Sequence, residues 1–249
     1  MRNFLFGLFL LAVLTAAAPL PALAQGSSFT PAQRAEIVAI IRDAMKQDPS
    51  ILRDAVATLQ EEENSQQNQA QTGVLRSFAQ ELNRKPGDPV AGNPNGTVTL
   101  VEFSDVRCPY CRRMLPVLAQ VLHDNKDLRI VYKDMPVLGP GSMVGARAEL
   151  AAQNQGAYEK LHQLLMTGTS TITEDVVKTD ALKLGLDWPR LQADMKSQDV
   201  QDRIDANLAM ARRLDLQGTP AYVIGDTLLP GAVELAELQH AVDAARHAN

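Results

Sequence analysis

The chain has 249 residues, with 24 basic and 29 acidic side chains, so its net charge is −5 when the histidines are neutral. An acidic balance argues against nucleic acid and against anionic membrane surfaces as partners. The length is sufficient for a sizeable hydrophobic core. A disulfide between the two cysteines, three positions apart, would close too short a loop to stabilise the fold much.

The first 24 residues have the pattern of a secretory signal peptide. Arg2 precedes an apolar run over residues 4–18, and small residues at 22 and 24 fit a cleavage site. Two prolines after residue 18 interrupt the run before it reaches the ~20 residues that a membrane-spanning helix needs. Loss of residues 1–24 would leave 23 basic and 29 acidic side chains, a net charge of −6. We therefore predict a mature chain that is not inserted in a membrane, in a compartment that tolerates disulfides.

Residues 25–85 are predicted to form an N-terminal helical region. A capping box starts at Thr30, isoleucines follow at helical spacing, and two further apolar stripes lead into a segment rich in proline and glycine. The segment itself offers few other residues against which these stripes could be buried. Either the following domain or other copies of the chain must therefore cover them. Self-association is the preferred interpretation. The polar stretch 61–73 is either a solvated helix or a flexible linker.

From residue 86 to residue 249 the pattern is that of a mixed α/β domain. Strands are expected at 97–103 and 128–132, and a hairpin with Gly225-Asp226 at its turn is expected over 221–229. A helix should close the chain. Residues from about 142 to 214 have helical patterns throughout, which predicts a helical insert between the second strand and the hairpin.

The two cysteines lie in the stretch RCPYCRRM, directly after the first predicted strand. Cys108 falls at a helix start, with Pro109 at the first helical position. Free N–H groups and the helix dipole stabilise a thiolate there, so Cys108 is expected to be a nucleophile. The spacing brings Cys111 to the same side one turn later. This arrangement predicts a thiol redox couple.

Two further features support redox chemistry. Glu102 shares strand parity with Val98 and Leu100, so its carboxylate should point into a buried face, where ionisation is costly and the pKa rises. Such a group can exchange a proton with Cys111. Thr219-Pro220 precedes the predicted hairpin, and a cis peptide there would expose the Thr219 backbone to an incoming peptide chain.

The alternative from another class is a Cu(I)-binding protein that uses the same two thiolates, with Met114 as a further ligand. Zinc is excluded because no suitably spaced ligands accompany the cysteines, and no metal site is predicted otherwise. The four histidines are interpreted as surface residues on helices; they are His123, His162, His240 and His247.

The strand VEFSD, the motif CPYC, the helical insert and the stretch QGTPAYVIGD together resemble the DsbA family of periplasmic thiol–disulfide oxidoreductases, over about residues 90–249. The preceding helices are similar to those of longer members. Among these, the ScsC-like (suppressor of copper sensitivity) proteins are closest in outline; their N-terminal region builds a trimer that isomerises wrong disulfides.

The resemblance implies a thioredoxin fold and a role for each motif residue. Cys108 would be the exposed nucleophile and Cys111 the resolving thiol, and the two would form the redox-active disulfide. Glu102 would be the buried acid. Thr219-Pro220 would be the cis-proline loop that binds substrate together with Pro109-Tyr110.

The same resemblance implies no separate cofactor, a periplasmic location, and a homo-oligomer, in particular a trimer. The partners would be unfolded or misoxidised secreted proteins and a membrane redox partner that resets the thiols. Threonine before the proline favours a disulfide isomerase or reductase. A DsbA-like dithiol oxidase is the alternative.

Overall fold

The computed structural model describes residues 29–168 and 171–248. The chain forms two compact units, Met1–Glu61 and Glu62–Asn249. The predicted signal peptide at 1–24 lies outside the described residues.

The first unit consists of helix α1 (Pro31–Gln47) and the first part of helix α2 (Ser50–Ser77). The predicted capping box is confirmed, because Gln33 N donates to Thr30 Oγ1 at 3.3 Å and Thr30 N donates to Gln33 Oε1 at 2.8 Å. No residue of α1 is buried. Large apolar side chains stand exposed along both helices of this unit: Ile37, Val38, Ile40, Ile41, Met45, Ile51, Leu52, Val56 and Leu59.

The polar stretch 61–73 is helical, as part of α2. Of the two alternatives that the sequence left open, a solvated helix is therefore the form observed. Almost every side chain in this stretch is exposed, which agrees with its lack of large apolar residues.

The second unit begins well before the expected boundary at 85/86. Leu75 near the end of α2 and Leu82 in helix α3 (Ala79–Arg84) are buried in the same apolar cluster as the sheet residues Val101 and Phe103. Residues 75–84 therefore pack as part of the α/β unit. The sequence pattern could not reveal this, because an apolar stripe does not identify the surface that covers it.

Five strands form the sheet in the order β1-β3-β2-β4-β5. Strand β2 pairs in parallel with β3 and antiparallel with β4, and the edge strands β1 and β5 run antiparallel to their neighbours. The hairpin and both central strands were predicted; β1 was not, because three residues ending in glycine carry little signal. The bounds are β1 (Val90–Gly92), β2 (Val98–Ser104), β3 (Leu128–Asp134), β4 (Ala221–Ile224) and β5 (Thr227–Pro230).

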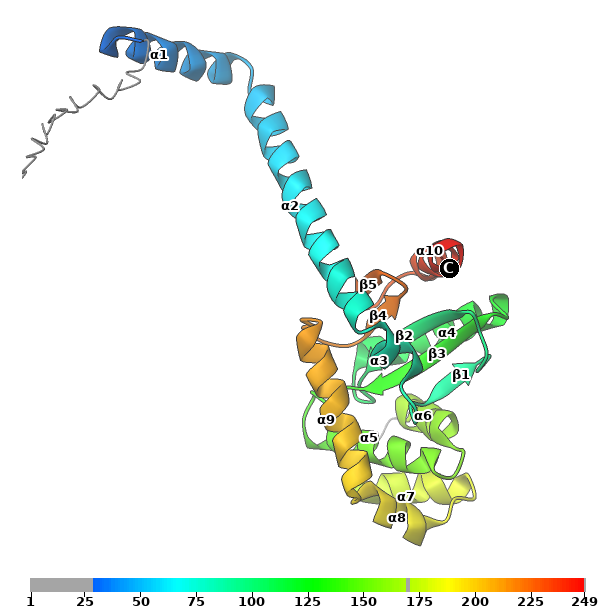
Figure 1. Ribbon diagram of the computed structural model, residues 1–249. Helices are drawn as coiled ribbons and strands as arrows, with labels where there is room; N and C mark the ends of the chain where they lie inside the picture. The colour runs from blue at the N-terminus through cyan, green and yellow to red at the C-terminus, as the bar shows by residue number, and fades with distance from the viewer. Residues whose placement is uncertain (1–28, 169–170, 249) are drawn as a thin grey trace, which may run out of the picture. The chain divides into compact units, whose positions relative to one another are not determined.

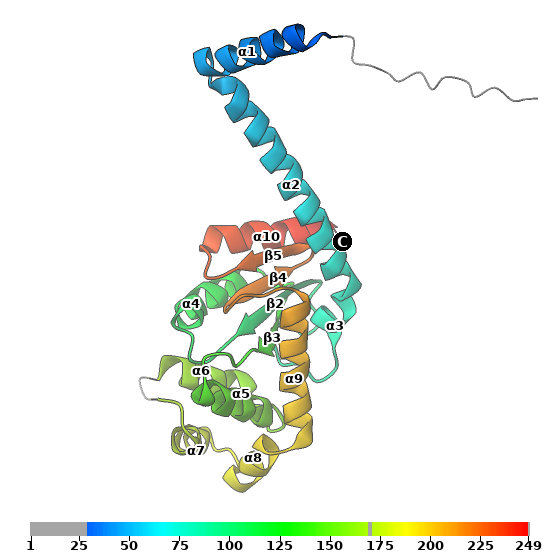
Figure 2. The same cartoon turned by 90° about the vertical axis from the view of Figure 1, so that its left-hand side faces the viewer.

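The predicted insert is helical, and its helices α5 to α8 lie together at one end of the α/β unit (Figures 1 and 2). One sheet face packs against α4, α10 and the insert, and the other packs against α3 and the last turns of α9. The bounds are α4 (Pro109–Asp124), α5 (Pro140–Gln153), α6 (Tyr158–Thr167), α7 (Glu174–Lys183), α8 (Trp188–Met195), α9 (Gln198–Arg213) and α10 (Leu235–Ala248). None of the helices in the described part of the chain is both long and apolar enough to cross a membrane.

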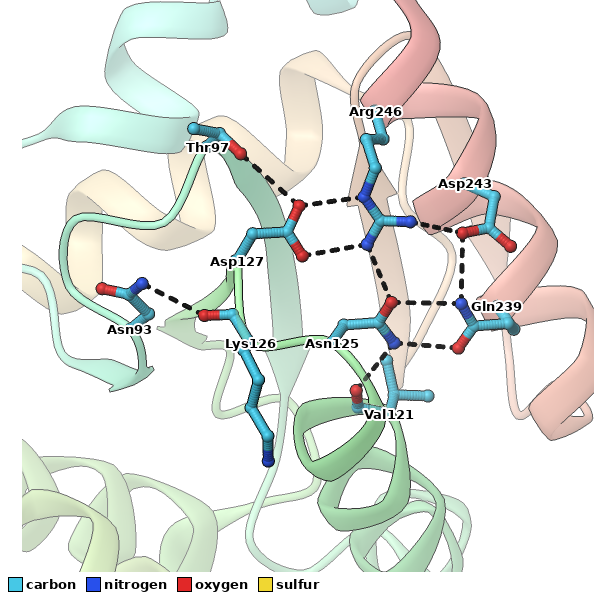
Figure 3. Close-up of polar contacts among 9 residues, drawn as sticks. All are labelled: Asn93, Thr97, Val121, Asn125, Lys126, Asp127, Gln239, Asp243 and Arg246. Atoms are coloured by element: carbon cyan, nitrogen blue, oxygen red, sulfur yellow. Dashed lines mark hydrogen bonds and ion pairs between the residues drawn. The ribbon is translucent and has the colours of Figure 1, made fainter.

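A polar network fixes α10 to the turn between α4 and β3 (Figure 3). Arg246 donates two hydrogen bonds of 2.9 Å to Asp127 and one of 2.8 Å to Asn125 Oδ1. Gln239 exchanges hydrogen bonds with Asn125, and Asp243 accepts from both Gln239 and Arg246. We call Asn125, Asp127, Gln239, Asp243 and Arg246 the α10 network.

Candidate active site

Cys108 is the N-cap residue of α4, and Pro109 is its first helical residue, as the sequence predicts. Both Cys108 and Cys111 are free thiols. The expectation that Cys108 is exposed is wrong: the residue is only 4% exposed. The reason is the loop before β4, since the Cys108 Sγ lies 3.1 Å from the Thr219 carbonyl oxygen, to which the thiol donates.

The Thr219–Pro220 peptide is cis, which confirms the sequence prediction. A groove of about 510 Å³ runs beside this loop and leads to the start of α4. Tyr110 and Thr219 both line the groove, and Tyr110 is 54% exposed with the Arg113 guanidinium 4.7 Å from its ring centre. Pro109 is exposed beside them. Three of the four residues expected to contact substrate therefore line one groove; they are Tyr110, Thr219 and Pro220.

Asp105, the last residue of VEFSD, connects the loops that follow β2 and β3, and this role was not predicted from the sequence. It is buried, and its carboxylate accepts hydrogen bonds from the backbone N–H groups of Arg107, Val137 and Leu138 at 2.8–3.1 Å. The Cys108 N–H donates to the Asp105 carbonyl oxygen at 2.8 Å. An aspartate that ends a strand before a turn is the signal that could have indicated this role.

Glu102 is buried on the face that its strand parity predicts, with 1% of its surface exposed. The Tyr222 hydroxyl donates to Oε1 at 3.3 Å, and no described residue forms a hydrogen bond with Oε2. Burial raises the pKa of Glu102 to about 7, and the charge of Asp134 adds to the rise, whereas His162 and the Tyr222 hydrogen bond oppose it. Glu102 can therefore gain or lose a proton near neutral pH.

Cys111 lies deeper than Cys108, with 1% of its surface exposed. Burial raises the pKa of the Cys111 thiol far above its ordinary value, and the negative charges of Glu102 and Cys108 raise it further. Cys111 needs a nearby base before it can act as a thiolate. Glu102 is electrostatically coupled to this thiol and has a pKa suited to the task.

The methionine that packs against the two cysteines is Met166 of α6. Met114, the further ligand considered for a Cu(I) site, instead lies in the core between the sheet and α4. Within residues 29–168 and 171–248, no group of three or more His, Cys, Asp and Glu side chains is placed to hold a metal ion.

His162 is buried with 1% of its surface exposed, so its assignment to the surface is wrong. It lies on α6, whose apolar face packs into the core of the insert, and that packing could not be read from the helix pattern alone. The other three histidines are exposed as predicted; they are His123, His240 and His247.

Comparisons with known proteins identify the family to which the chain belongs. The model of the DSBA-like thioredoxin domain matches residues 99–243. A thioredoxin-like oxidoreductase from Silicibacter pomeroyi DSS-3 is 44% identical, with a TM-score of 0.66 over 68% of this chain and 98% of that one. ScsC of Proteus mirabilis, in a transitional conformation, is 30% identical, with a TM-score of 0.64 over 90% of this chain and 99% of that one.

One relative is much longer than this chain, and only part of it matches. The Na(+)/H(+) antiporter NhaA 1 of Salinispora arenicola is 29% identical over 160 residues, which are 64% of this chain. The match covers 24% of the antiporter, so the chain spans about a quarter of that relative's length. The family match, by contrast, extends over more than half of this chain and contains both cysteines, Glu102 and the cis-proline loop. The chain belongs to the DSBA-like thioredoxin domain family, and its fold is the thioredoxin fold with a helical insert.

Proposed function

We propose that the chain catalyses thiol–disulfide exchange on protein substrates, and that it acts as a disulfide isomerase or reductase. The observation that carries this proposal is the arrangement at Cys108. Its sulfur lies at the start of a helix, 3.1 Å from the Thr219 carbonyl oxygen. Cys111 is buried in the same site, and Glu102, whose pKa is about 7, is electrostatically coupled to the Cys111 thiol.

In the proposed reaction, the Cys108 thiolate attacks one sulfur of a substrate disulfide. A mixed disulfide forms and the other substrate sulfur leaves as a thiolate, which takes a proton from solvent. Cys111 then gives its proton to Glu102 and attacks Cys108, which releases the second substrate thiol and leaves a Cys108–Cys111 disulfide. In isomerisation the released substrate thiolate instead attacks another disulfide of the same substrate, which frees a different substrate thiolate. That thiolate attacks the substrate sulfur of the mixed disulfide, forms a new substrate disulfide and releases Cys108 as a thiolate.

The groove beside the cis-proline loop fits an extended peptide. Thr219 presents backbone atoms at its edge, and Tyr110 and Leu228 supply apolar contacts. Main-chain recognition of this kind accepts many sequences, as a catalyst for unfolded or misoxidised secreted proteins requires. Such action belongs in the periplasm, with a membrane redox partner that resets the thiols.

The activity test compares two substrates. Refolding of a scrambled multi-disulfide protein measures isomerisation, and oxidation of the same protein after full reduction measures dithiol oxidation. We expect the wild-type chain to accelerate the first more than the second. Cys108→Ala should abolish both, and Cys111→Ala should accumulate a mixed disulfide with substrate. Absence of exchange with either substrate would overturn the proposal, whereas oxidation without isomerisation would identify a DsbA-like oxidase.

We infer that residues 29–61 assemble copies of this chain, as a trimer. The inference is supported by nine large apolar side chains that are 38–61% exposed in the single chain, on two consecutive helices. Assembly would place several Cys108 thiols around one substrate and raise their effective concentration, commonly to about the mM range.

The assembly test uses the boundary that the structure provides. A chain that starts at Glu62 keeps Leu75 and Leu82 in its core, so it should fold as a monomer, exchange thiols and lose isomerase activity. A chain starting at Gln25 should scatter light as an oligomer and keep isomerase activity. A monomeric longer chain would contradict the assembly proposal.

Cu(I) binding is a second candidate function, favoured by the grouping of Met166 with both cysteines in one buried cluster. Thiolate and thioether ligands are those that Cu(I) prefers. Titration of the reduced protein with Cu(I) in competition with a chromogenic chelator would test it. We expect Cys108→Ala and Met166→Leu to weaken binding; unchanged affinity in both variants would exclude this site.

A further inference from the structure

A second cluster of buried polar side chains lies behind Glu102, between the sheet and the insert. Its members come from β3, α5 and α6, and none is more than 6% exposed. We define the buried cluster as Tyr132, Asp134, Glu149, Tyr158 and His162. Buried ionisable groups are costly, so a set of this size needs either a structural or a chemical reason.

The contacts within the cluster centre on His162. Its Nδ1 lies 3.1 Å from Glu149 Oε1, and its ring centre lies 5.2 Å from that of Tyr132 and 5.8 Å from that of Tyr158. The Tyr158 hydroxyl donates to Asp134 Oδ1 at 2.8 Å. No hydrogen-bond partner within the described chain reaches His162 Nε2.

The buried cluster is linked to the proposed active site through Glu102. Glu102 pairs with Tyr132 in the register of β2 and β3, and the Tyr132 ring contacts His162. Protonated His162 lowers the pKa of Glu102. Burial lowers the pKa of His162, and ionised Glu102 raises it in return. The favoured state of the Glu102–His162 pair is therefore one in which the two side chains together carry a single proton.

Acidic groups around His162 raise its pKa when they are ionised, against the effect of burial. Asp134 on β3 and Glu159 on α6 both raise the pKa of His162, and Glu149 on α5 contacts its Nδ1. Burial raises the pKa values of Asp134 and Glu149 well above the usual range, which favours their neutral forms. Helix α4 contributes only apolar side chains to the surface around His162.

His162 also lines a cavity of about 540 Å³ between α4 and α6, together with Tyr132, Glu159 and Lys160. This cavity shares no lining residue with the substrate groove. The cavity therefore lies on a side of the molecule that a substrate bound in the groove does not cover.

We propose that His162 is a positioning residue for thiol–disulfide exchange, which holds a proton so that Glu102 is ionised when Cys111 must be deprotonated. The inference rests on the proposed exchange function. In balance, the proton of neutral Glu102 leaves and His162 gains one, and the carboxylate then takes the proton of Cys111 as its sulfur attacks Cys108. His162 afterwards returns its proton to solvent, and no further oxidant or reductant is needed.

The test measures release of substrate from the mixed disulfide against pH, in wild type, His162→Gln and the control His123→Gln. His123 is a suitable control because its side chain is 76% exposed at the end of α4. Without His162 the carboxyl of Glu102 loses a stabilising positive charge, so the midpoint of release should move up by about one pH unit, roughly a fivefold loss of rate at pH 7. Formation of the mixed disulfide and the His123→Gln profile should not change.

A second measurement keeps the proposal testable if His162→Gln folds poorly. The His162 ring is titrated by NMR in wild type and in Glu102→Gln, with His123 as internal reference. Coupling is reciprocal, so loss of the Glu102 charge should lower the midpoint of His162 and leave that of His123 unchanged. Unchanged release profiles in a folded His162→Gln protein, or identical His162 titrations in the second measurement, overturn the inference. Failure of wild type to exchange thiols would instead refute the proposed function.

Discussion

The α10 network and the buried cluster are both polar, but they are built on opposite principles. In the α10 network, Arg246 faces Asp127 and Asp243, and their side chains are 35–47% exposed. Its hydrogen bonds raise the pKa of Arg246 and lower that of Asp127, so both charged forms are favoured. The buried cluster has two acids, Asp134 and Glu149, and its histidine is favoured neutral by burial.

The difference indicates what each region contributes. Complementary charges that satisfy one another at a half-exposed site stabilise a contact, here between α10 and the α4–β3 turn. Acids buried without a cation oppose folding, and such arrangements are found where a group must change its protonation state. We therefore expect the α10 network to act on stability alone, and Glu102 with the buried cluster to act on chemistry at a cost in stability.

The largest expected effect is a loss of stability as the pH rises. The pKa of Glu102 is raised from 4.5 to about 7 in the folded chain. Its contribution to the free energy of unfolding is therefore fully present below pH 4.5 and is lost as the pH rises through 7. A shift of this size corresponds to about 3 kcal/mol in the free energy of unfolding. Denaturant unfolding of wild type and Glu102→Gln at pH 5 and pH 8 measures it; we expect a flatter pH dependence in the variant.

The raised pKa values of Asp134 and Glu149 act in the same direction as that of Glu102. Asp127 acts in the opposite direction: its lowered pKa gives a contribution that is present above its unfolded pKa and is lost as the pH falls. A wild-type chain that gains stability between pH 5 and pH 8 would show that ionised Glu102 is not penalised by its surroundings.

The second effect concerns the rate of exchange. Glu102→Gln removes the base that is coupled to Cys111, so release of substrate from the mixed disulfide should slow by ~10²-fold at pH 7, whereas mixed-disulfide formation at Cys108 should change little. Stopped-flow measurement of the two steps separates them. Arg246→Lys, within the α10 network, is the matched control and should keep both rates. Equal slowing of both steps would contradict the role of Glu102.

Much of the α/β unit could be predicted from the sequence because its signals are local. Strand alternation identified the central strands, Gly225-Asp226 identified the hairpin, and the position of Pro109 after Cys108 identified the helix start. Strand parity alone placed Glu102 in the core. Each of these rules depends only on residues that are neighbours in the chain.

The features that were missed depend on packing between distant segments. The exposure of Cys108 is set by the loop at Thr219, 111 positions away, and Met166 reaches the cysteines from the insert. The burial of His162 follows from the way α6 packs on the sheet and α5. A histidine on an amphipathic helix has no local pattern that distinguishes a core position from a surface one.

The third effect is on stability alone. Arg246→Ala removes hydrogen bonds to Asn125, Asp127 and Asp243, and we expect it to lower the free energy of unfolding by about 1–2 kcal/mol at low salt. Thermal unfolding at two salt concentrations measures the loss, which should shrink at high salt because the side chains are partly exposed. Exchange rates should remain those of wild type. A slowed release step in Arg246→Ala would remove the distinction between the two regions.

The smallest effect is expected at the edge of the α10 network. The Thr97 hydroxyl lies 3.5 Å from Asp127 Oδ2, at the limit of a hydrogen bond, and Thr97 is exposed just before β2. Water can replace the hydroxyl there, and valine keeps the branched shape that a strand end accepts. Thr97→Val should therefore change the free energy of unfolding by less than about 0.5 kcal/mol, measured by denaturant unfolding beside Arg246→Ala. A loss as large as that of Arg246→Ala would mean that Asp127 is positioned by Thr97 as much as by the guanidinium, and that the α10 network depends on β2.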